Sequence, residues 1–411
     1  MTTDSPRMPR VVRHALIGIG GGTLLASCAR DAPQDTWQPE GDYAQTIHNL
    51  QWPVFLLAGI VGLIVMGAVF FTVFKFRDRG QAIPEQGHGN ALIEYVFIAI
   101  PALLLASIAV PTVDTILKLN DTKAADCVIN VTGQQWWWEF DYPVDTAGNI
   151  CGFQPKVDAS PIVTSGQMVI PTNAKVVIRG TSRDVIHSFW VPKLNGKRDM
   201  VPGRVHTWNF EADRPGIYAG QCAEFCGLSH ANMRMEIVAL DPVDYQAWID
   251  NQLEPYQSPE EDTLAATGEG TFVSQCSRCH QVNGLTNADG DLIISAPEQY
   301  VWSGAAPNLT NLMTRNTFAG ASWDLLTQDC RDDVWKATPE EFGAKYLAGV
   351  SQECLNQIDL KEWLRNAPAK KPMYADPEKL VETGGKTRGM PYLALSEDQI
   401  NELVAYLIER K

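Results

Sequence analysis

Two long apolar segments dominate the hydropathy pattern near the start of the chain. Residues 53–74 carry no charged side chain over 22 positions. As a helix they would rise about 33 Å, slightly more than the roughly 30 Å hydrocarbon core of a bilayer. The second segment, at about 93–116, contains Pro101 and Pro111, which membrane helices tolerate where neighbouring groups satisfy the freed carbonyls. The pattern predicts a two-helix transmembrane hairpin, with burial in a soluble core as the alternative.

Charged residues beside these segments predict the orientation of the hairpin. Lys75, Arg77 and Arg79 directly follow the first segment, and short basic loops stay on the cytoplasmic side. Both ends of the mature chain are therefore expected outside. Glu94 lies near the start of the second segment, where an ionisable residue is either functional or snorkels to the membrane interface.

The N-terminus has the pattern of an export signal. Three arginines precede an apolar run at residues 15–26, which is too short to span a bilayer. The run ends in Leu-Ala-Ser-Cys28, which resembles a bacterial lipobox. We expect residues 1–27 to be a lipoprotein signal peptide and Cys28 to be lipidated. A plain signal peptide with an incidental cysteine is the alternative.

The pattern changes between Cys127 and about Asp241. Short apolar or β-branched runs, separated by Pro and Gly, predict a β-sandwich or barrel. These runs lie at 128–131, 168–171, 176–178 and 235–238.

A polar stretch at 255–262 indicates a linker. Helical patterns follow at 263–276, 339–350, 355–364 and 396–410. Residues 263–411 are therefore predicted to form a separate, mostly α-helical domain.

Charge and cysteine content narrow the function. The net charge of −15 argues against nucleic acid as a partner, because phosphate binding needs a basic surface. Nine cysteines indicate an oxidising compartment. One is Cys28 and two pairs belong to the motifs below. The remaining four allow three pairings, of which proximity favours Cys127–Cys151 and Cys330–Cys354. Four buried free thiols are the alternative.

The strongest motif is Cys222-Ala-Glu-Phe-Cys226-Gly-Leu-Ser-His230-Ala-Asn-Met233, with His187 upstream. Two thiolates, two imidazoles and a thioether form a soft donor set that suits copper in electron transfer. Cysteines four apart on one loop can place both sulfurs between two metal ions. Zinc or a disulfide are the alternatives, but zinc does not explain the methionine or the glutamate between the cysteines.

This run resembles the binuclear copper A loop of cytochrome c oxidase subunit II, with a match at each ligand position. The resemblance implies that Cys222 and Cys226 bridge two copper ions. It also implies that His187 and His230 cap them and that Met233 is an axial ligand.

Three further stretches resemble the same family: 184–189 around the first histidine, 197–204 as the turn against the catalytic subunit, and 133–142 as the aromatic strand over copper. The last implies that electrons enter through Trp136. Gln134 and Trp137 stand where the family usually has histidine and tyrosine, which alters the donor-docking surface.

Two glutamates gain roles from the resemblance. Glu224 would give its backbone carbonyl to copper and its carboxylate to a Mg²⁺ or Mn²⁺ at the interface with subunit I. Glu94 precedes Pro101 by seven residues, the spacing of the family's glutamate at the mouth of the K proton channel.

Cys276-Ser-Arg-Cys279-His280 is the signature of covalent c-type haem attachment, with zinc binding or redox use as alternatives. Its surroundings, including residues 304–310, resemble a class I cytochrome c. That resemblance makes His280 the proximal iron ligand.

The sixth iron ligand is chosen among three methionines that follow the motif. Met390 is preferred because it lies in Gly-Met-Pro just before the last helix, with Met313 and Met373 as alternatives. His/Met ligation raises the potential of a haem. Residues 317–384 exceed a minimal cytochrome c and are interpreted as an insertion closed by a disulfide. No function is inferred for this insertion.

The resemblances together imply a three-part protein. We expect the hairpin within 28–120, an all-β cupredoxin-like Greek-key domain at 121–254, and a class I cytochrome c domain at 263–411. Such a chain would be subunit II of a haem–copper cytochrome c oxidase. Electrons would pass from haem c to copper A and on to subunit I, where dioxygen is reduced to water with proton pumping.

The same resemblance predicts partners and location. Subunits I and III are expected partners, with a bc-type complex or a soluble cytochrome c as donor. We expect a bacterial cell membrane with both redox domains on its outer face. The alternatives are a quinol oxidase subunit II, which lacks the copper ligands, and a membrane-anchored carrier serving nitric oxide or another reductase.

Overall fold

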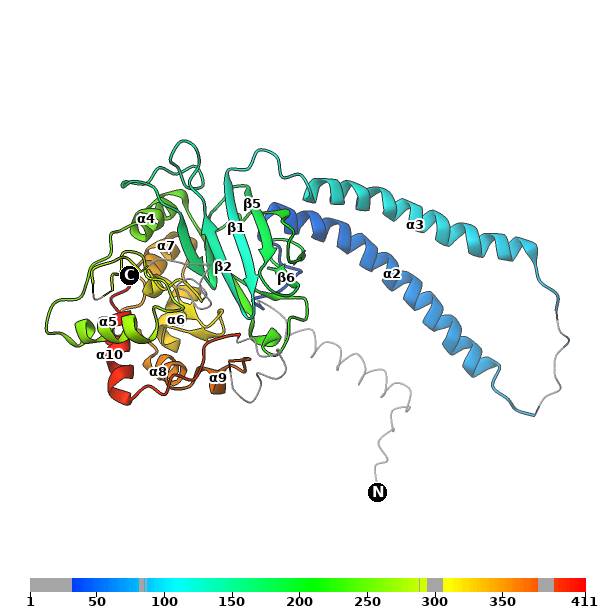
Figure 1. The fold of residues 1–411 in the computed structure, drawn as a ribbon. Helices are drawn as coiled ribbons and strands as arrows, with labels where there is room; N and C mark the ends of the chain where they lie inside the picture. Colours follow the sequence, from blue (N-terminus) through cyan, green and yellow to red (C-terminus); the bar gives the residue numbers. More distant parts are fainter. Residues whose placement is uncertain (1–31, 81–84, 86, 288, 294–305, 376–387) are drawn as a thin grey trace, which may run out of the picture.

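The computed structural model describes residues 32–80, 85, 87–287, 289–293, 306–375 and 388–411. The expected signal peptide and Cys28 lie outside the described residues. Two long helices project from a β-domain, and the helices of the C-terminal region lie on the opposite side of that domain (Figure 1).

The two projecting helices are α2, Asp42–Lys75, and α3, Ala91–Leu119. Both are long and apolar enough to cross a membrane, and their apolar segments are not buried by the rest of the chain. Helix α2 begins before the predicted segment, so Pro53 lies inside it. Lys118 pairs with Asp42 at 3.1 Å and joins the two helices at the end next to the β-domain.

The β-domain consists of two five-stranded sheets, ordered β3-β2-β1-β5-β8 and β4-β10-β9-β6-β7. Their strands are β1 Cys127–Gln134, β2 Trp137–Tyr142, β3 Ile162–Ser165, β4 Gln167–Pro171, β5 Val176–Ser182, β6 His187–Trp190, β7 Arg198–Met200, β8 His206–Phe210, β9 Gly216–Cys222 and β10 Arg234–Leu240. All four predicted runs are strands. Alternate residues of β1 are buried, as the two-residue period of a strand requires.

Aromatic side chains fill the core of this domain. The rings of Trp138 and Phe189 lie 5.1 Å apart between centroids, and those of Phe189 and Phe210 lie 5.7 Å apart. Helix α4, Pro242–Gln252, was not predicted from the sequence. It packs Trp248 against Tyr142 at 5.1 Å and covers one end of the core.

The C-terminal region is helical, and all four predicted helices are present. They are α5 Leu264–Gln275, α7 Pro339–Leu347, α8 Gln357–Arg365 and α10 Glu397–Leu407, with α6 Gln328–Trp335, α9 Ala367–Lys370 and the short pair β11 Thr317–Phe318 and β12 Trp323–Asp324 between them. Helices α5 and α10 cross closely at Gly268, where a Cβ atom would lie 2.0 Å from the Glu402 carbonyl oxygen.

The structure has the two disulfides that proximity favours, Cys127–Cys151 and Cys330–Cys354. The first links the start of β1 to the β2–β3 connection. The second links α6 to the segment before α8 inside the insertion. Both join residues 24 positions apart.

Most of the segment at 255–262, predicted to be a linker, is exposed, but Tyr256 near its start is held by the C-terminal region. The Tyr256 hydroxyl bonds to Glu269 and lies 3.2 Å from the Tyr406 hydroxyl, and the Arg410 guanidinium lies 4.7 Å from the Tyr256 ring centroid. The C-terminal region also bonds directly to the β-domain, as in Arg315 Nη1 to Ser165 Oγ at 2.8 Å. The connection is therefore fixed on both sides and does not act as a free tether.

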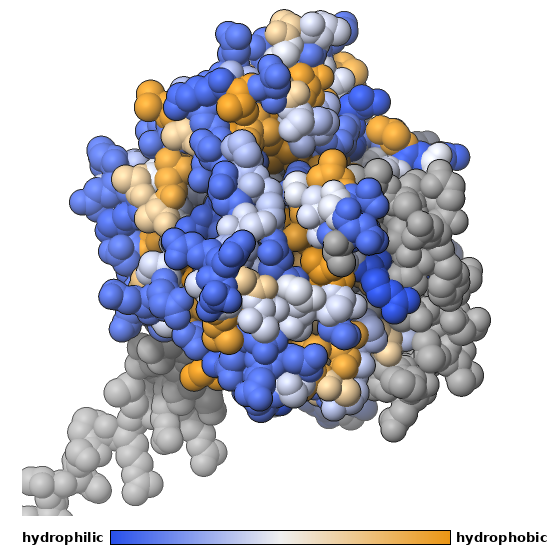
Figure 2. All heavy atoms as spheres, turned by 60° about the vertical axis from the view of Figure 1, so that its left-hand side comes forward, coloured by the Kyte–Doolittle hydropathy of each residue, from blue (hydrophilic) through white to orange (hydrophobic). Residues whose placement is uncertain are grey.

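The outer face of the C-terminal region is mainly polar. Figure 2 shows hydrophilic residues over most of this face, with apolar residues in small separate groups. The long apolar surface of the chain therefore belongs to α2 and α3.

Candidate metal centre

The candidate metal centre lies on the connection between β9 and β10. The Cys222 amide donates to the Met233 carbonyl at 2.9 Å and closes the base of this loop. The Ala223 amide donates to the Ser188 carbonyl at 2.9 Å and ties the loop to β6. Strand pairing thus brings His187, the first residue of β6, next to Cys222, the last residue of β9.

The donor atoms fall into two similar halves. Cys222 Sγ lies 3.9 Å from His187 Nδ1 and 3.3 Å from the Glu224 carbonyl oxygen. Cys226 Sγ lies 3.5 Å from His230 Nδ1 and 3.7 Å from Met233 Sδ. The two sulfurs are 3.8 Å apart. Each half therefore offers one sulfur, one imidazole nitrogen and one weaker donor, which suits a pair of soft metal ions.

Asp184 orients the first histidine. Its Oδ1 lies 2.8 Å from His187 Nε2, and its Oδ2 accepts from the Gln135 amide at 2.8 Å. Occupation of Nε2 leaves Nδ1 facing Cys222, the arrangement in which a carboxylate fixes the tautomer of a metal-binding histidine. Burial opposes ionisation of Asp184, but these hydrogen bonds hold its pKa below the usual value. Burial also opposes protonation of His187, but Asp184 and Cys222 together outweigh it and raise the pKa of that imidazole.

The two thiols act as one titrating unit. The hydrogen bond from Cys226 is the largest effect on Cys222 and lowers its pKa, against the effect of burial. The pKa of Cys226 is raised, chiefly by Cys222 and then by burial. One thiolate therefore forms readily, and a bound cation would favour the second.

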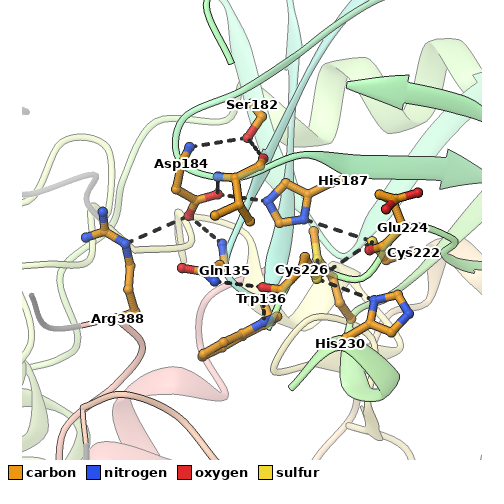
Figure 3. A network of polar contacts seen from close by, with 12 residues as sticks. Gln135, Trp136, Ser182, Asp184, His187, Cys222, Glu224, Cys226, His230 and Arg388 are labelled. Atoms are coloured by element: carbon orange, nitrogen blue, oxygen red, sulfur yellow. Dashed lines mark hydrogen bonds and ion pairs between the residues drawn. The ribbon is translucent and has the colours of Figure 1, made fainter. Parts of the chain in front are cut away.

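Trp136 contacts the same loop from β2's side. Its indole Nε1 donates to the Cys226 carbonyl at 3.0 Å, and Gln135 Nε2 donates to the same oxygen at 2.7 Å. Figure 3 shows Gln135 and Trp136 side by side, with Asp184 between Gln135 and Arg388. The predicted site of electron arrival is thus one hydrogen bond from a candidate copper ligand.

Glu224 presents its two oxygen-bearing groups in different directions. Its carbonyl lies beside Cys222, whereas its side chain is exposed. The side chain lines a cavity of about 480 Å³ together with Asp199, His206 and the basic residues Lys197 and Arg198. This single residue can therefore reach both the copper donors and an outer interface.

A β-sandwich that holds two cysteines, two histidines and a methionine at one end defines the class of cupredoxin-like copper proteins. Residues 34–115 match the family described as "Cytochrome C oxidase subunit II, transmembrane domain", and residues 127–240 match "Cytochrome C oxidase subunit II, periplasmic domain". The chain belongs to the cytochrome c oxidase subunit II family. It is therefore part of an oxidoreductase, and the family's periplasmic domain implies a binuclear copper A centre.

Relatives support this membership along most of the chain. Cytochrome c oxidase subunit 2 of Alkalihalophilus pseudofirmus is 36% identical over 296 residues, which cover 69% of this chain and 81% of the relative. The same subunit of Bacillus sp. strain PS3 is 30% identical over 405 residues and 94% of both chains. A crystal structure of the periplasmic domain of subunit II of cytochrome oxidase from Bradyrhizobium japonicum is 29% identical. It covers 31% of this chain and 94% of that chain, with a TM-score of 0.27.

The Cys-x-x-Cys-His motif forms a tight turn after α5. The His280 amide donates to the Cys276 carbonyl at 2.9 Å, and the Cys279 amide donates to the same oxygen at 3.1 Å. His280 Nδ1 lies 2.8 Å from the Pro307 carbonyl, which orients the imidazole within the turn. Burial lowers the pKa of His280 and so favours its neutral form.

Two of the three candidate methionines, Met373 and Met390, belong to neighbouring segments, whereas Met313 lies in the core. Met390 is half-buried just before α10 and packs against the C-terminal core. A Cβ atom at Gly389 would lie 2.3 Å from Met373 Sδ, so the Met373 sulfur is next to this segment. Met313 is fully buried, and its amide donates to the Arg410 carbonyl at 2.7 Å.

Three residues at these sites were not predicted from the sequence. Asp184 was noticed only as a neighbour of His187, although a carboxylate three residues from a ligand could have been recognised as its orienting group. Arg315 and Lys371 are buried cations, 4% and 3% exposed, that belong to no motif. Each has a partner more than a hundred positions away, Ser165 for Arg315 and Trp136 for Lys371, and local sequence carries no signal for such contacts.

Proposed function

We propose that this chain is the electron-accepting subunit of a haem–copper cytochrome c oxidase and carries a covalent haem c as well as copper A. Electrons would arrive at the haem, pass to copper A, and leave for subunit I, where dioxygen is reduced to water with proton pumping. The observation that carries the proposal is the docking of a domain with a Cys-x-x-Cys-His turn directly against the copper loop.

The donor set fits a pair of copper ions. Cys222 and Cys226 would hold them through their thiolates, His187 and His230 would each supply Nδ1, and Met233 would supply a thioether. The centre supplies one-electron transfer with little rearrangement. The chain's own role is to hold these donors in place through the sheet and Asp184, so that they converge before any metal arrives.

The C-terminal domain fits a haem for a separate reason. Arg315 lies in the domain core with Nη2 donating to the Asn308 carbonyl at 2.7 Å, and its Nε has no hydrogen-bond partner. Among the described residues no carboxylate pairs with it, and burial lowers its pKa to about 10. A buried cation without a counter-ion is costly, and a haem carboxylate would supply the missing charge. A bound haem c supplies a one-electron carrier, with Cys276 and Cys279 attaching it and His280 and Met390 ligating it.

The exposed side of Glu224 suits the interface with subunit I. The cavity that it lines has two carboxylates and one imidazole on its wall, together with the basic turn at 197–204. A Mg²⁺ or Mn²⁺ held there through Glu224 would be completed by the partner subunit. Subunit III and a bc-type complex or soluble cytochrome c complete the proposed assembly.

The membrane assignment follows from the hairpin. The basic residues after α2 and Glu94 in the first turn of α3 lie at the same end of the two helices, away from the β-domain. That end would face the cytoplasm of a bacterial cell, with Glu94 at the mouth of the proton channel. The redox domains would lie on the outer face, and lipidation of Cys28 would add an anchor there.

The test is copurification and turnover. An affinity tag on this chain should recover a large haem-containing membrane subunit and a complex that consumes dioxygen with a reduced c-type donor. Cys226→Ser should keep the assembly and abolish this consumption. A complex that reduces nitric oxide and not dioxygen would contradict the proposal.

A further inference from the structure

We propose that residues Lys371–Tyr374, here called the clamp, close the Trp136 side of the copper site against external donors. Electrons then reach Trp136 only from the chain's own C-terminal domain, through Tyr374. The electron route rests on the proposed function, whereas the closure is a property of the folded chain. The clamp lies at the end of the insertion, for which the sequence suggested no role.

Trp136 has no open face for a partner. It is only 2% exposed, and its ring centroid lies 5.1 Å from that of Tyr374. A Cβ atom at Gly227 would lie 3.3 Å from the Tyr374 hydroxyl and 3.3 Å from a Trp136 ring carbon. The Tyr374 ring therefore covers Trp136 and the copper loop together.

Lys371 holds the clamp against the β-domain through hydrogen bonds to backbone carbonyls. Its ammonium group donates to the carbonyls of Trp136 at 2.9 Å, Asn232 at 2.9 Å and Ala319 at 2.7 Å. These three acceptors use all three donors of a lysine. The carbonyls belong to the start of β2, the end of the copper loop and the insertion, so one buried side chain joins all three.

Further hydrogen bonds extend this contact. Ser229 Oγ donates to the Pro372 carbonyl at 2.5 Å, and the Arg234 amide donates to the Gly320 carbonyl at 3.1 Å. Arg388 Nε lies 3.9 Å from Asp184 Oδ2 on the other side of the site (Figure 3). The clamp is part of a cross-linked body, because it follows α8 and α9 and the insertion contains the Cys330–Cys354 disulfide.

The clamp therefore determines which electron donor can reach Trp136. A soluble donor cannot contact Trp136 unless the clamp opens, so it must dock on the C-terminal domain. A one-electron transfer from a reduced haem to an oxidised copper pair would form or break no bond and move no proton. The rings of Tyr374 and Trp136, which lie 5.1 Å apart between centroids, would not themselves be oxidised.

Closure is tested first, by hydrogen exchange on the full-length chain. Lys371→Met leaves three buried carbonyls without their donor, so the amides of His230 and Asn232 should exchange roughly tenfold faster or more. Lys370→Met is the matched control, because the neighbouring lysine pairs with Asp359 and Glu362 inside the insertion. Unchanged exchange of the copper loop in Lys371→Met would overturn the clamp, whatever cofactors the chain carries.

The route is tested by rapid mixing of the assembled oxidase with a reduced soluble cytochrome c. Wild type and Tyr374→Phe should reduce haem before copper, whereas Tyr374→Leu should slow the haem-to-copper step, because it removes the ring that packs against Trp136. The copper resonance spectrum should be the same in all three. Equal rates in Tyr374→Leu, or copper reduced first in wild type, would overturn the route. Absence of either cofactor spectrum would instead count against the proposed function.

Discussion

The copper loop and the proposed haem-attachment turn differ in how far the polypeptide alone assembles the site. In the copper loop, each cysteine sulfur already lies within 4 Å of a histidine nitrogen. In the haem-attachment turn, Cys276, Cys279 and His280 share hydrogen bonds of a single turn, and the candidate methionines come from other segments. A small metal pair can be preformed by a sheet, whereas a large prosthetic group must become part of the core that surrounds it.

The largest expected effect is the loss of one cofactor without the other when a cysteine of either site is replaced. Cys226→Ser removes one of the two candidate thiolate ligands and should abolish the copper spectrum while leaving the proposed covalent haem intact. Cys279→Ser should weaken haem attachment and leave copper binding unchanged. Copper analysis and a haem stain on denatured gels of both variants measure this, and loss of both cofactors in either variant would contradict independent assembly.

The two disulfides allow a direct comparison of the regions. Each closes a loop of the same length, for which chain entropy gives about 3.5 kcal/mol. Double alanine variants of each pair should lose similar unfolding free energy in urea. A much smaller loss for Cys330 and Cys354 would show that the insertion is already ordered in the unfolded reference state or unfolds separately.

A buried carboxyl at the boundary of the two regions should make stability depend on pH. Glu236 on β10 accepts from Gln167 Nε2 at 2.6 Å, and burial raises its pKa to about 7, with Asp324 adding to the rise and Arg331 opposing it. The folded state therefore holds the proton more tightly than the unfolded state. This contribution is complete below about pH 4.5 and is lost as pH rises through 7.

Glu236→Gln removes this dependence. The variant should gain up to about 3 kcal/mol relative to wild type at pH 8 and little at pH 4, from the 1.36 kcal/mol per pKa unit. Denaturant unfolding at the two pH values measures the difference. A gain of equal size at both pH values would show that ionisation of Glu236 is not its cause.

The smallest expected effect concerns the orienting carboxylate. Asp184→Asn keeps the shape of the side chain but weakens its hold on His187, and should reduce copper affinity about 10–100-fold. Asp141→Asn is a suitable control, because that carboxylate bonds to Asn130 and not to a candidate ligand. Copper competition with a chelator distinguishes the two, and equal affinities would mean that the sheet alone positions the imidazole.

The features that could be predicted from the sequence are those formed by residues close together along the chain. The copper donors, apart from His187, lie within twelve residues, and the apolar segments and the helices of the C-terminal region have regular periods. Helix α4 was missed because its apolar residues are few and it follows a strand directly. The contacts of Tyr256 within the predicted linker could not be foreseen, because polar composition says nothing about what this side chain meets.

Contacts between the two regions could not be predicted in the same way. Lys371 and Arg315 are single basic residues whose meaning depends on carbonyls and hydroxyls more than a hundred positions away. Burial of a cation also contradicts the usual expectation from composition. Such residues become visible only when the fold brings their partners together, and both of them join the C-terminal region to the β-domain.

The central claim is that one chain carries both a binuclear copper centre and a haem, and electron paramagnetic resonance of the oxidised full-length chain tests it most directly. The account predicts a copper signal from one electron shared by two nuclei together with a low-spin ferric haem signal. It also predicts that Cys226→Ser loses only the first. A signal from a single isolated copper ion, or a chain with copper and no haem, would contradict it.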